Sequence, residues 1–310
     1  MKPLKKLAGV VLAWNVLVIL GGAVVRATGS GAGCGAHWPT CNGSVVPLAP
    51  SMATLIEYSH RATSGLALLL VALLLHQVWR HRERGHLSRF WAAASMVLIL
   101  SEAAIGAGLV LFQRVADDPS IARGFWISGH LINTFLLLGA LTLTARWVDV
   151  PGIALEGTGV GPLQATFKGA HRDPATIAAL LALLATGVSG AIAALGDTLF
   201  KASSLAEAIA QDFSPASHLF VRLRIFHPLI ALIGGGLVLL IAYRTMTSNP
   251  NRPKTRQRGL LLAGMVVAQW FLGLTNVVLL APTWLQVVHL FVADLIWMTL
   301  IVVVAADPEV

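Results

Sequence analysis

Long apolar runs recur along the chain and are separated by shorter polar segments. An α-helix needs about 20 apolar residues to cross the hydrocarbon core of a bilayer, and each run is close to that length. The pattern therefore predicts an all-α membrane protein with eight transmembrane helices. The predicted spans are residues 7–26, 58–79, 91–112, 125–146, 174–195, 223–244, 259–280 and 285–305.

The first apolar run extends from Leu7 to Val25. It is longer than the apolar core of a secretory signal peptide, and no A-x-A cleavage site follows it. We therefore expect this run to be retained as the first membrane span.

Basic residues are distributed unevenly among the connections between the spans. The N-terminus and the connections after the second, fourth and sixth spans hold most of the 22 Lys and Arg residues. Loops rich in Lys and Arg stay on the cytoplasmic side of a membrane. We therefore predict a multi-pass protein of the cell (inner) membrane with both termini cytoplasmic. The loop that contains Cys34 and Cys41 is then on the outer side.

Composition agrees with a membrane location. The chain is 56% hydrophobic and 12% charged, whereas a soluble domain carries about 25% charged residues. The net charge of +8 would suit nucleic-acid binding, but the positive-inside rule already accounts for it. We expect this chain to contact membrane lipid and not to bind nucleic acid.

Short matches recur in the same order at an offset of about 167 residues. The segments EYSH and RIFH, ending at His60 and His227, stand before apolar runs, and IGAGLVL and LGLTNVVL lie in the third and seventh spans. We predict two tandem pseudo-symmetric four-helix bundles, residues 1–147 and 173–310, related by an axis along the membrane normal. The Gly- and Pro-rich segment 148–172 is the predicted cytoplasmic linker.

Four of the ten histidines lie near the start of an even-numbered span: His60, His130, His227 and His289. We place each within about the first turn, so the four rings share one depth in the outer leaflet. A titratable ring in hydrocarbon is costly and usually pairs with another group or coordinates a metal. A hydrogen bond to a neighbouring helix would explain one histidine, but two repeat-related pairs favour ligation.

Each of these spans contributes a single imidazole, whereas zinc sites draw several ligands from short local spacings. Two imidazoles that face each other across a four-helix bundle suit a flat macrocycle held axially. We therefore predict two bis-histidine haem pockets, His60/His130 and His227/His289, and no other metal site. Spacing alone leaves a copper centre open.

The two predicted pockets differ in the residue three positions before the first histidine. Glu57 precedes His60 on the same helix face, and its counterpart is Arg224. A carboxylate can accept a proton or stabilise positive charge, so we expect the N-terminal pocket to be the reactive one. An arginine can pair with a haem propionate. A salt bridge between Glu57 and Arg61 is the structural alternative.

Four further charged residues lie within or beside the predicted spans. Arg61 and Arg222 join Arg224 as candidate contacts for haem propionates. Glu102 and Asp294 lie inside predicted spans, and the sequence assigns them no role.

The two cysteines occur in one segment, CGAHWPTC at 34–41. Two cysteines this close on the outer side favour a disulfide. A metal site that includes His37 is the alternative, but it lacks an obvious fourth ligand.

Together these features resemble the haem A synthase family, and the resemblance covers nearly the whole chain. It depends most on GSGAGCGAHWPTCNG at 29–43 and IEYSHR at 56–61. It implies that the C8 methyl of haem O is oxidised to a formyl group by successive hydroxylations and loss of water. It also implies haem O between His60 and His130, a catalytic Glu57, and an iron-containing haem b between the other two histidines. A haem O synthase and an electron acceptor are the implied partners.

Two other functions fit parts of the pattern. A di-haem membrane cytochrome that transfers electrons from quinol would explain the four histidines, but not the contrast between Glu57 and Arg224. A transporter built of repeats would explain the Gly-rich odd-numbered spans, such as Gly21, Gly22, Gly187 and Gly190. A transporter would not need four histidines at one depth in the membrane. Glycine is also common in membrane helices for another reason, because it lets neighbouring helices pack closely.

Overall fold

The structure, a computed structural model, describes residues 2–151, 159–248 and 252–306. Within these ranges it contains helices and no strand, and eight spans are long and apolar enough to cross a membrane. The predicted all-helical class and the predicted number of spans are therefore confirmed. The spans are α1 (Lys2–Ala27), α2 (Met52–His81), α3 (Leu87–Leu111), α4 (Ile121–Trp147), α6 (Pro174–Leu199), α8 (Leu219–Arg224) with α9 (Phe226–Ser248), α10 (Pro253–Val278) and α11 (Thr283–Val304).

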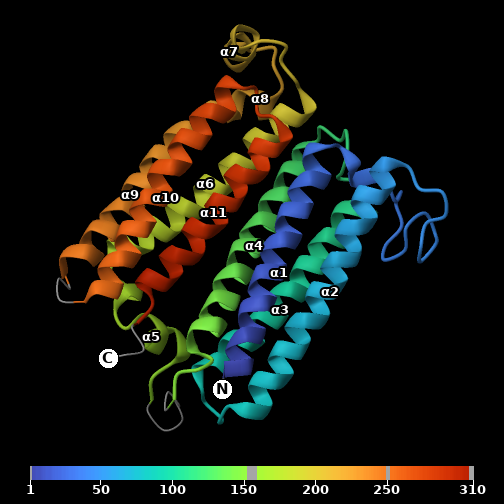
Figure 1. The fold of residues 1–310 in the computed structure, drawn as a ribbon. Coiled ribbons are helices and arrows are strands. Elements are labelled where there is room, and N and C mark those ends of the chain that lie inside the picture. The colour runs from blue at the N-terminus through green and yellow to red at the C-terminus, as the bar shows by residue number, and fades with distance from the viewer. Residues whose placement is uncertain (1, 152–158, 249–251, 307–310) are drawn as a thin grey trace.

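The spans lie in two groups (Figure 1). Helices α1 to α4 form one group, in which α1 packs along α2 and α3 along α4. Helices α6, α9, α10 and α11 form the other, in which α9 packs against both α6 and α10. The groups meet where α1 and α4 contact α6 and α11. Origin of the groups by duplication, with boundaries at 1–147 and 173–310, stays a prediction.

Aromatic packing fastens the two groups at their interface. Phe135 of α4 stacks on Trp297 of α11, with ring centroids 5.3 Å apart. The Trp297 indole N–H also donates a hydrogen bond to the Phe135 carbonyl at 2.6 Å. Gly139, one turn further along α4, lies against the same indole, so the two helices approach closely there.

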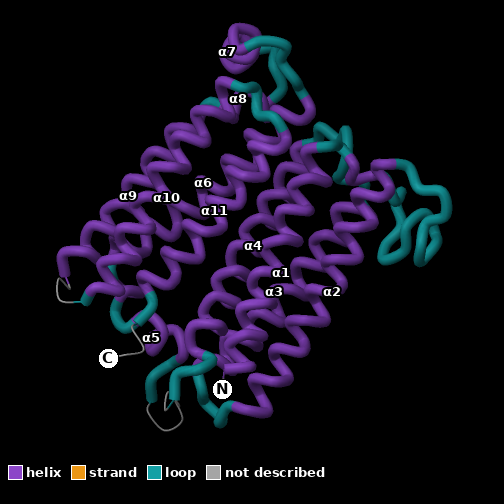
Figure 2. Tube along the Cα trace, viewed as in Figure 1, coloured by secondary structure: helices purple, strands orange, loops and turns teal. Residues whose placement is uncertain are grey.

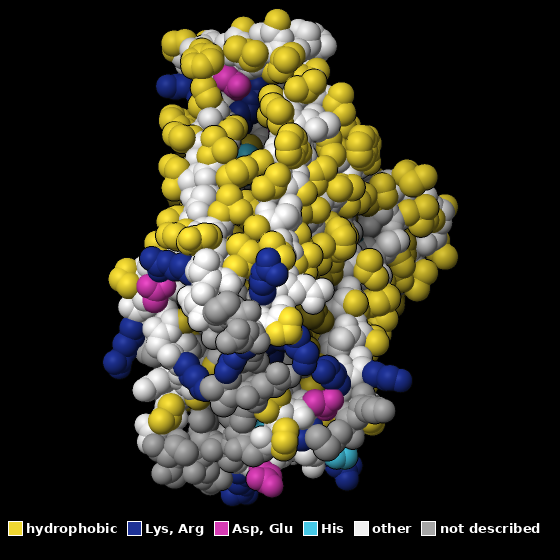
Figure 3. Space-filling view, turned by 60° about the vertical axis from the view of Figure 1, so that its left-hand side comes forward, with side chains coloured by type: hydrophobic (Ala, Val, Ile, Leu, Met, Phe, Trp, Pro, Cys, Tyr) yellow, Lys and Arg dark blue, Asp and Glu magenta, His cyan; other side chains and the backbone are white. Residues whose placement is uncertain are grey.

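The surface of the spans is largely apolar, as contact with lipid requires. Figure 3 shows hydrophobic side chains over the middle and upper part of the molecule and Lys and Arg side chains gathered toward the lower end. That lower end carries the start of α1, as Figures 1 and 2 show. The end of α11 lies there too, because Ala306 N–H donates to Thr166 O and Ala306 O accepts from Arg146. Placement of this end in the cytoplasm stays a prediction.

The helices that carry the histidines begin earlier than predicted. Ser51 and Ser120 cap α2 and α4: each hydroxyl accepts a hydrogen bond from a backbone N–H three residues on, at 3.2 Å. The predicted spans left out these first turns because polar residues interrupt the apolar runs there, namely Thr54, Glu57 and Arg123. His60 and His130 therefore lie about two turns inside their helices, so the first-turn prediction was wrong.

The other two histidines are also deeper than predicted. His227 follows α8, which begins at Leu219 and forms one span with α9. His289 is about two turns into α11, which begins at Thr283.

The predicted linker contains structure of its own. It forms α5 (Pro162–Phe167) and the short 3-10 helix η2 (Ala170–Arg172), while residues 152–158 fall outside the described ranges. Thr166 of α5 accepts a hydrogen bond from the Trp91 indole at 2.9 Å through its hydroxyl. The described part of this segment therefore packs on α3 and the end of α11.

Candidate functional site

Each of the four histidine rings lies against a glycine on a neighbouring helix. Glycine lacks a Cβ, so the ring can approach the helix backbone closely. The same arrangement occurs in both groups of helices: glycines of α1 and α3 face α2 and α4, and glycines of α6 and α10 face α9 and α11. The pairs, with the distance from a Cβ placed on the glycine to the ring Cε1, are Gly22–His60 (3.1 Å), Gly106–His130 (3.9 Å), Gly190–His227 (2.9 Å) and Gly273–His289 (3.3 Å).

The structure brings the histidines together in the two pairs that the sequence indicated. His60 is close enough to His130 for electrostatic interaction, and His289 is close enough to His227. The first pair joins α2 and α4, and the second joins α9 and α11. Each group of four helices therefore contains one pair of neighbouring imidazoles.

The chemistry of these pairs fits a haem better than a bare metal ion. Nδ1 is buried and has no hydrogen-bond partner among the described residues in His60, His130 and His289, so a hydrogen bond from Nδ1 to a neighbouring helix does not account for these three rings. The described residues also contain no group of three or more His, Cys, Asp or Glu that could hold a metal ion. The four ring nitrogens of a haem already bind its iron, so the protein would need to supply only one or two further ligands.

His130 has a carboxylate beside it. Glu102 of α3 places Oε1 at 3.3 Å from His130 Nδ1, although the two atoms are not aligned as a hydrogen bond. Oε1 also accepts from the Thr134 hydroxyl, and Oε2 accepts from the Asn133 amide at 2.5 Å. Sequence reasoning assigned Glu102 no role, because its partners lie on another helix.

Glu57 lies buried at the base of the disulfide loop, residues 28–51. Arg61 donates to its Oε1 from Nη2 at 2.5 Å and from Nε at 3.1 Å. The backbone N–H of Cys34 donates to its Oε2 at 2.7 Å. The salt bridge considered as the structural alternative is therefore present, and a catalytic role for Glu57 stays a prediction.

Arg61 connects this carboxylate to the loop. Its Nη1 donates to the carbonyls of His37 and Thr40 at 2.6 and 2.7 Å. All three guanidinium nitrogens thus contact Glu57 or the loop, and a contact of Arg61 with a haem propionate stays a prediction.

The predicted disulfide between Cys34 and Cys41 is present, and both residues are buried. The loop packs tightly on the start of α2. A Cβ on Gly33 would lie 2.5 Å from the Ala53 carbonyl, so glycine is required at this position. The Thr54 hydroxyl donates to Gly33 O at 2.8 Å. The disulfide therefore closes a loop that is already fastened to the helix bearing Glu57.

Replacing both cysteines by serine is expected to lower the free energy of unfolding by about 2–3 kcal/mol, because the closed loop limits the unfolded chain. Thermal unfolding in detergent measures this loss, and the wild type treated with a reductant should show the same shift. An unchanged midpoint in both samples would contradict a stabilising role for the Cys34–Cys41 bond.

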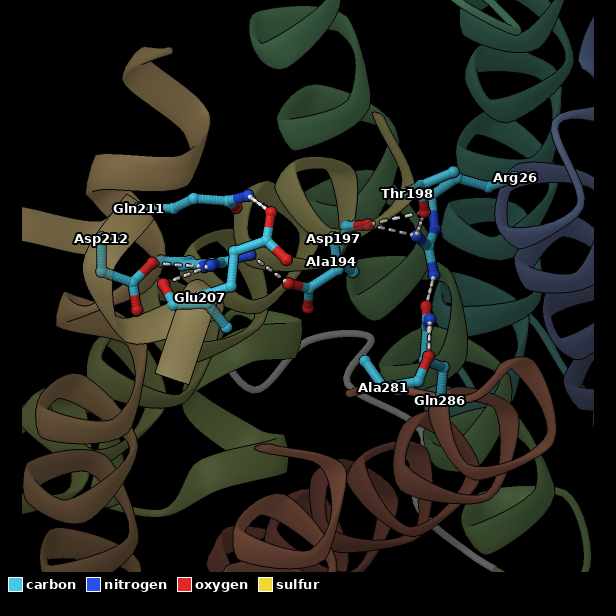
Figure 4. A network of polar contacts seen from close by, with 11 residues as sticks. Arg26, Ala194, Asp197, Thr198, Glu207, Gln211, Asp212, Ala281 and Gln286 are labelled. Atoms are coloured by element: carbon cyan, nitrogen blue, oxygen red, sulfur yellow. Dashed lines mark hydrogen bonds and ion pairs between the residues drawn. The ribbon is translucent and has the colours of Figure 1, made fainter. Parts of the chain in front are cut away.

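Arg224 is held by two carboxylates in the other group of helices. Its Nε donates to Asp212 at 2.5 Å and its Nη1 to Asp197 at 2.8 Å, while Nη2 donates to Ala208 O at 2.9 Å. Figure 4 shows both carboxylates in this network. The bonds fasten α8 to α6 and to α7 (Leu205–Phe213). Contacts of Arg224 and of the exposed Arg222 with propionates stay predictions.

The short helix α7 keeps a charged residue beside this network. Glu207 accepts hydrogen bonds from the hydroxyl and N–H of Ser203 at 2.5 and 2.7 Å. These bonds lower the pKa of the Glu207 carboxyl from its usual value. Glu207 also accepts from Gln211 (Figure 4), so the polar side of α7 stays ionised at neutral pH.

Another arginine, Arg26, connects the two groups of helices. Arg26 of α1 donates from Nη1 to Ala194 O and to the Thr198 hydroxyl of α6, at 2.9 and 3.0 Å. Its Nη2 donates to Gln286 Oε1 of α11 at 2.7 Å, and Gln286 in turn donates to Ala281 O (Figure 4). Arg26 was assigned no role from the sequence.

Arg26 lies one turn beyond both glycine–histidine contacts. Gly22, which faces His60, precedes it by one turn of α1, and Gly190, which faces His227, precedes Ala194 by one turn of α6. Arg26 therefore fixes the separation of the two histidine pairs.

Replacing Arg26 by alanine is expected to lower the free energy of unfolding by about 2 kcal/mol, because a charged hydrogen bond between the groups is lost. Thermal unfolding in detergent measures it. Alanine at the exposed Arg222 serves as the control and should change stability by less than about 0.5 kcal/mol. Equal effects of the two substitutions would contradict the bridging role of Arg26.

Comparisons with known proteins identify the family of this chain. The family described as cytochrome oxidase assembly protein matches residues 5–301. A Thermus thermophilus protein named protoheme IX farnesyltransferase is 48% identical over 288 residues, which are 93% of this chain and 46% of that protein. A heme A synthase of Shouchella clausii is 41% identical over 140 residues, 45% of this chain and 46% of that protein.

A heme A synthase of Bacillus cereus is 43% identical over 126 residues, 41% of this chain and 40% of that protein. The chain spans about half the length of the curated relatives it matches.

Proposed function

Because the chain belongs to the cytochrome oxidase assembly protein family, we propose that it acts in haem A biosynthesis as a membrane oxidoreductase that converts haem O to haem A. The observation that carries the proposal is the pair of neighbouring histidines in each group of helices, with every ring against a glycine of an adjacent helix. The relatives named heme A synthase support the same activity.

The name of the Thermus relative suggests where the substrate comes from. The match covers 46% of that protein, so more than half of it lies outside the segment similar to this chain. We propose that farnesyl transfer belongs to the unmatched part. A haem O synthase would then supply the substrate that this chain oxidises.

In the proposed reaction the C8 methyl carbon of haem O takes two hydroxyl groups from water in successive steps, releasing four electrons to an electron acceptor and four protons to bases. The resulting diol then loses one water to give the formyl group. His60 and His130 bind and orient the substrate in the N-terminal group of helices. Glu57 accepts a proton released as the methyl carbon is oxidised. Arg61 and the N–H of Cys34 hold the Glu57 carboxylate in a fixed place while it does so.

The C-terminal group holds the cofactor in this proposal. His227 and His289 would ligate a haem b, which supplies one-electron transfer when bound. The Ser189 hydroxyl lies 3.0 Å from His227 Nδ1 and fixes the orientation of that ring. An electron acceptor is also required, because the oxidation of haem O releases electrons.

The protein is proposed to reside in the inner membrane with the basic end in the cytoplasm. The gathering of Lys and Arg side chains toward one end supports this orientation (Figure 3). The Cys34–Cys41 loop, at the opposite end in Figure 1, then faces the outer side.

A di-haem cytochrome that accepts electrons from quinol is the second candidate. The observation that favours it is the ion pair between Glu57 and Arg61, because a carboxylate that serves only as a salt bridge needs no catalytic role. Four axial histidines would suit this function equally well.

Product analysis separates the two candidates. The protein is expressed with and without a haem O synthase and purified in detergent, and its extracted haems are identified by chromatography and mass spectrometry. We expect haem A or its hydroxylated precursor only when haem O is available. Haem b and unmodified haem O alone, with both pockets filled, would contradict the synthase and leave the cytochrome.

A further inference from the structure

The two groups of helices place different side chains beside corresponding histidines. Glu102 of α3 accompanies His130, and Gln269 occupies the matching position of α10 beside His289. We propose that Glu102 is a positioning residue for His130 that makes this imidazole a stronger iron ligand than His289. The inference rests on the proposed function to the extent that both histidines bind haem.

Glu102 is held firmly toward His130. The Asn133 amide donates to its Oε2 at 2.5 Å and also to Leu98 O at 2.9 Å, and Asn133 Oδ1 accepts from Ser101 at 2.7 Å. The Thr134 hydroxyl donates to Oε1, the same oxygen that lies 3.3 Å from His130 Nδ1. The carboxylate is therefore fixed by α4 itself, with Oε1 within hydrogen-bond distance of Nδ1 of His130.

The C-terminal group lacks this arrangement. Gln269 uses its Nε2 to donate to the backbone carbonyl of His289 at 3.0 Å. Its Oε1 is buried without a partner among the described residues, as is Nδ1 of His289. Val292 and Ala293 stand where α4 has the asparagine and threonine that hold Glu102. His289 therefore has a neutral amide beside it instead of a charged acceptor.

The other histidines of the two pairs have no carboxylate partner in the described part of the chain either. His227 meets the Ser189 hydroxyl, and Nδ1 of His60 has no hydrogen-bond partner among the described residues. Of the four predicted ligands, His130 is thus distinguished by an acidic neighbour within 4 Å in the described ranges.

A carboxylate that accepts from the distal ring nitrogen has known physical effects on a metal-bound histidine. It fixes the tautomer with Nε2 toward the metal, orients the ring and raises the basicity of the ligand. A more basic ligand stabilises ferric over ferrous iron, so the N-terminal haem should have the lower midpoint potential. One electron lost in the N-terminal pocket is then gained in the C-terminal pocket, and no proton has to move between them. Electrons would thus leave the half in which haem O is oxidised.

The test is a redox titration of purified full-length Glu102→Gln, with dithionite as reductant and ferricyanide as oxidant, followed by haem absorbance. Comparison with His289→Ala assigns the N-terminal signal. We expect the N-terminal midpoint potential to rise enough to change the ferrous-to-ferric ratio at a fixed potential about tenfold, which is about 59 mV. The electron paramagnetic resonance g values of that haem should change too, while the C-terminal haem stays unaltered.

Two further variants complete the test. Gln269→Glu combined with Val292→Asn and Ala293→Thr places in the C-terminal group the side-chain types that hold Glu102, and it should lower the midpoint potential of the C-terminal haem. An unchanged C-terminal potential in this variant would overturn the inference even if Glu102→Gln fails to fold. Glu207→Gln makes the same charge change at an exposed site and should move neither potential.

An N-terminal haem with unchanged potential and g values in Glu102→Gln would overturn the inference and leave Glu102 a fastening between α3 and α4. A wild-type protein whose N-terminal histidines bind no haem would overturn the proposed function as well. The two failures are therefore distinguishable.

Discussion

Glutamine in place of Glu57 is expected to abolish the oxidation of haem O while both haem pockets stay filled. Glutamine keeps the shape of the side chain, but its single amide oxygen can accept from either Arg61 or the N–H of Cys34 and not from both, and it cannot take up a proton. Loss of a general base slows a reaction by about 10²–10⁴-fold. The rate of haem O consumption and the haem content of the purified variant measure the two effects separately.

The ion pair with Arg61 requires a control that separates catalysis from stability. In the double variant Glu57→Gln with Arg61→Gln, neither member of the pair is left as an unpaired charge, so stability should recover relative to Glu57→Gln. If Glu57 is catalytic, the double variant stays inactive despite this recovery. Return of haem A formation in the double variant would show that Glu57 serves only as a salt bridge.

Alanine at either histidine of the C-terminal pair is expected to remove the haem b from that half. Loss of one axial imidazole leaves a haem with a single protein ligand, and each ring also fills the space left by a glycine, Gly190 or Gly273. We therefore expect His227→Ala and His289→Ala to lose about one haem per chain and to form no haem A. Haem content is measured from the absorbance of the extracted haem relative to protein.

The N-terminal pair gives a different result in the same measurement. His60→Ala should retain haem b and lose bound haem O. His76→Ala, a histidine of α2 away from both pairs, is the matched control and should leave both haems in place. Retention of full haem content by all three pair variants would contradict ligation by these histidines.

The fold was predictable because its main determinants are local in sequence. An apolar run of about 20 residues leaves few alternatives to a membrane helix, and two cysteines in the segment 34–41 are close enough to pair. Helix starts were less predictable, since capping by Ser51 and Ser120 extends α2 and α4 through turns in which polar residues interrupt the apolar pattern. This extension is why His60 and His130 lie deeper in their helices than hydropathy indicated.

The histidine pairs were predictable from the repeat, but their surroundings were not. The contact of Glu102 with His130, and the bonds from Arg26 to α6 and α11, join residues far apart in the chain. Hydropathy and spacing within one helix carry no information about such contacts. One signal was present: glycine recurs at matching positions of the odd-numbered spans, as Gly106 and Gly273 show. From the sequence, close packing of helices explained those glycines equally well. The structure shows that a histidine ring lies against each of them.

The most direct test of the central claim is a cryo-electron microscopy map of the wild-type protein, purified from cells that make haem O. The account predicts two flat macrocycles, one between His60 and His130 with density for a farnesyl tail, and one between His227 and His289 without it. Macrocycle density away from these pairs, or iron held by other side chains, would contradict it.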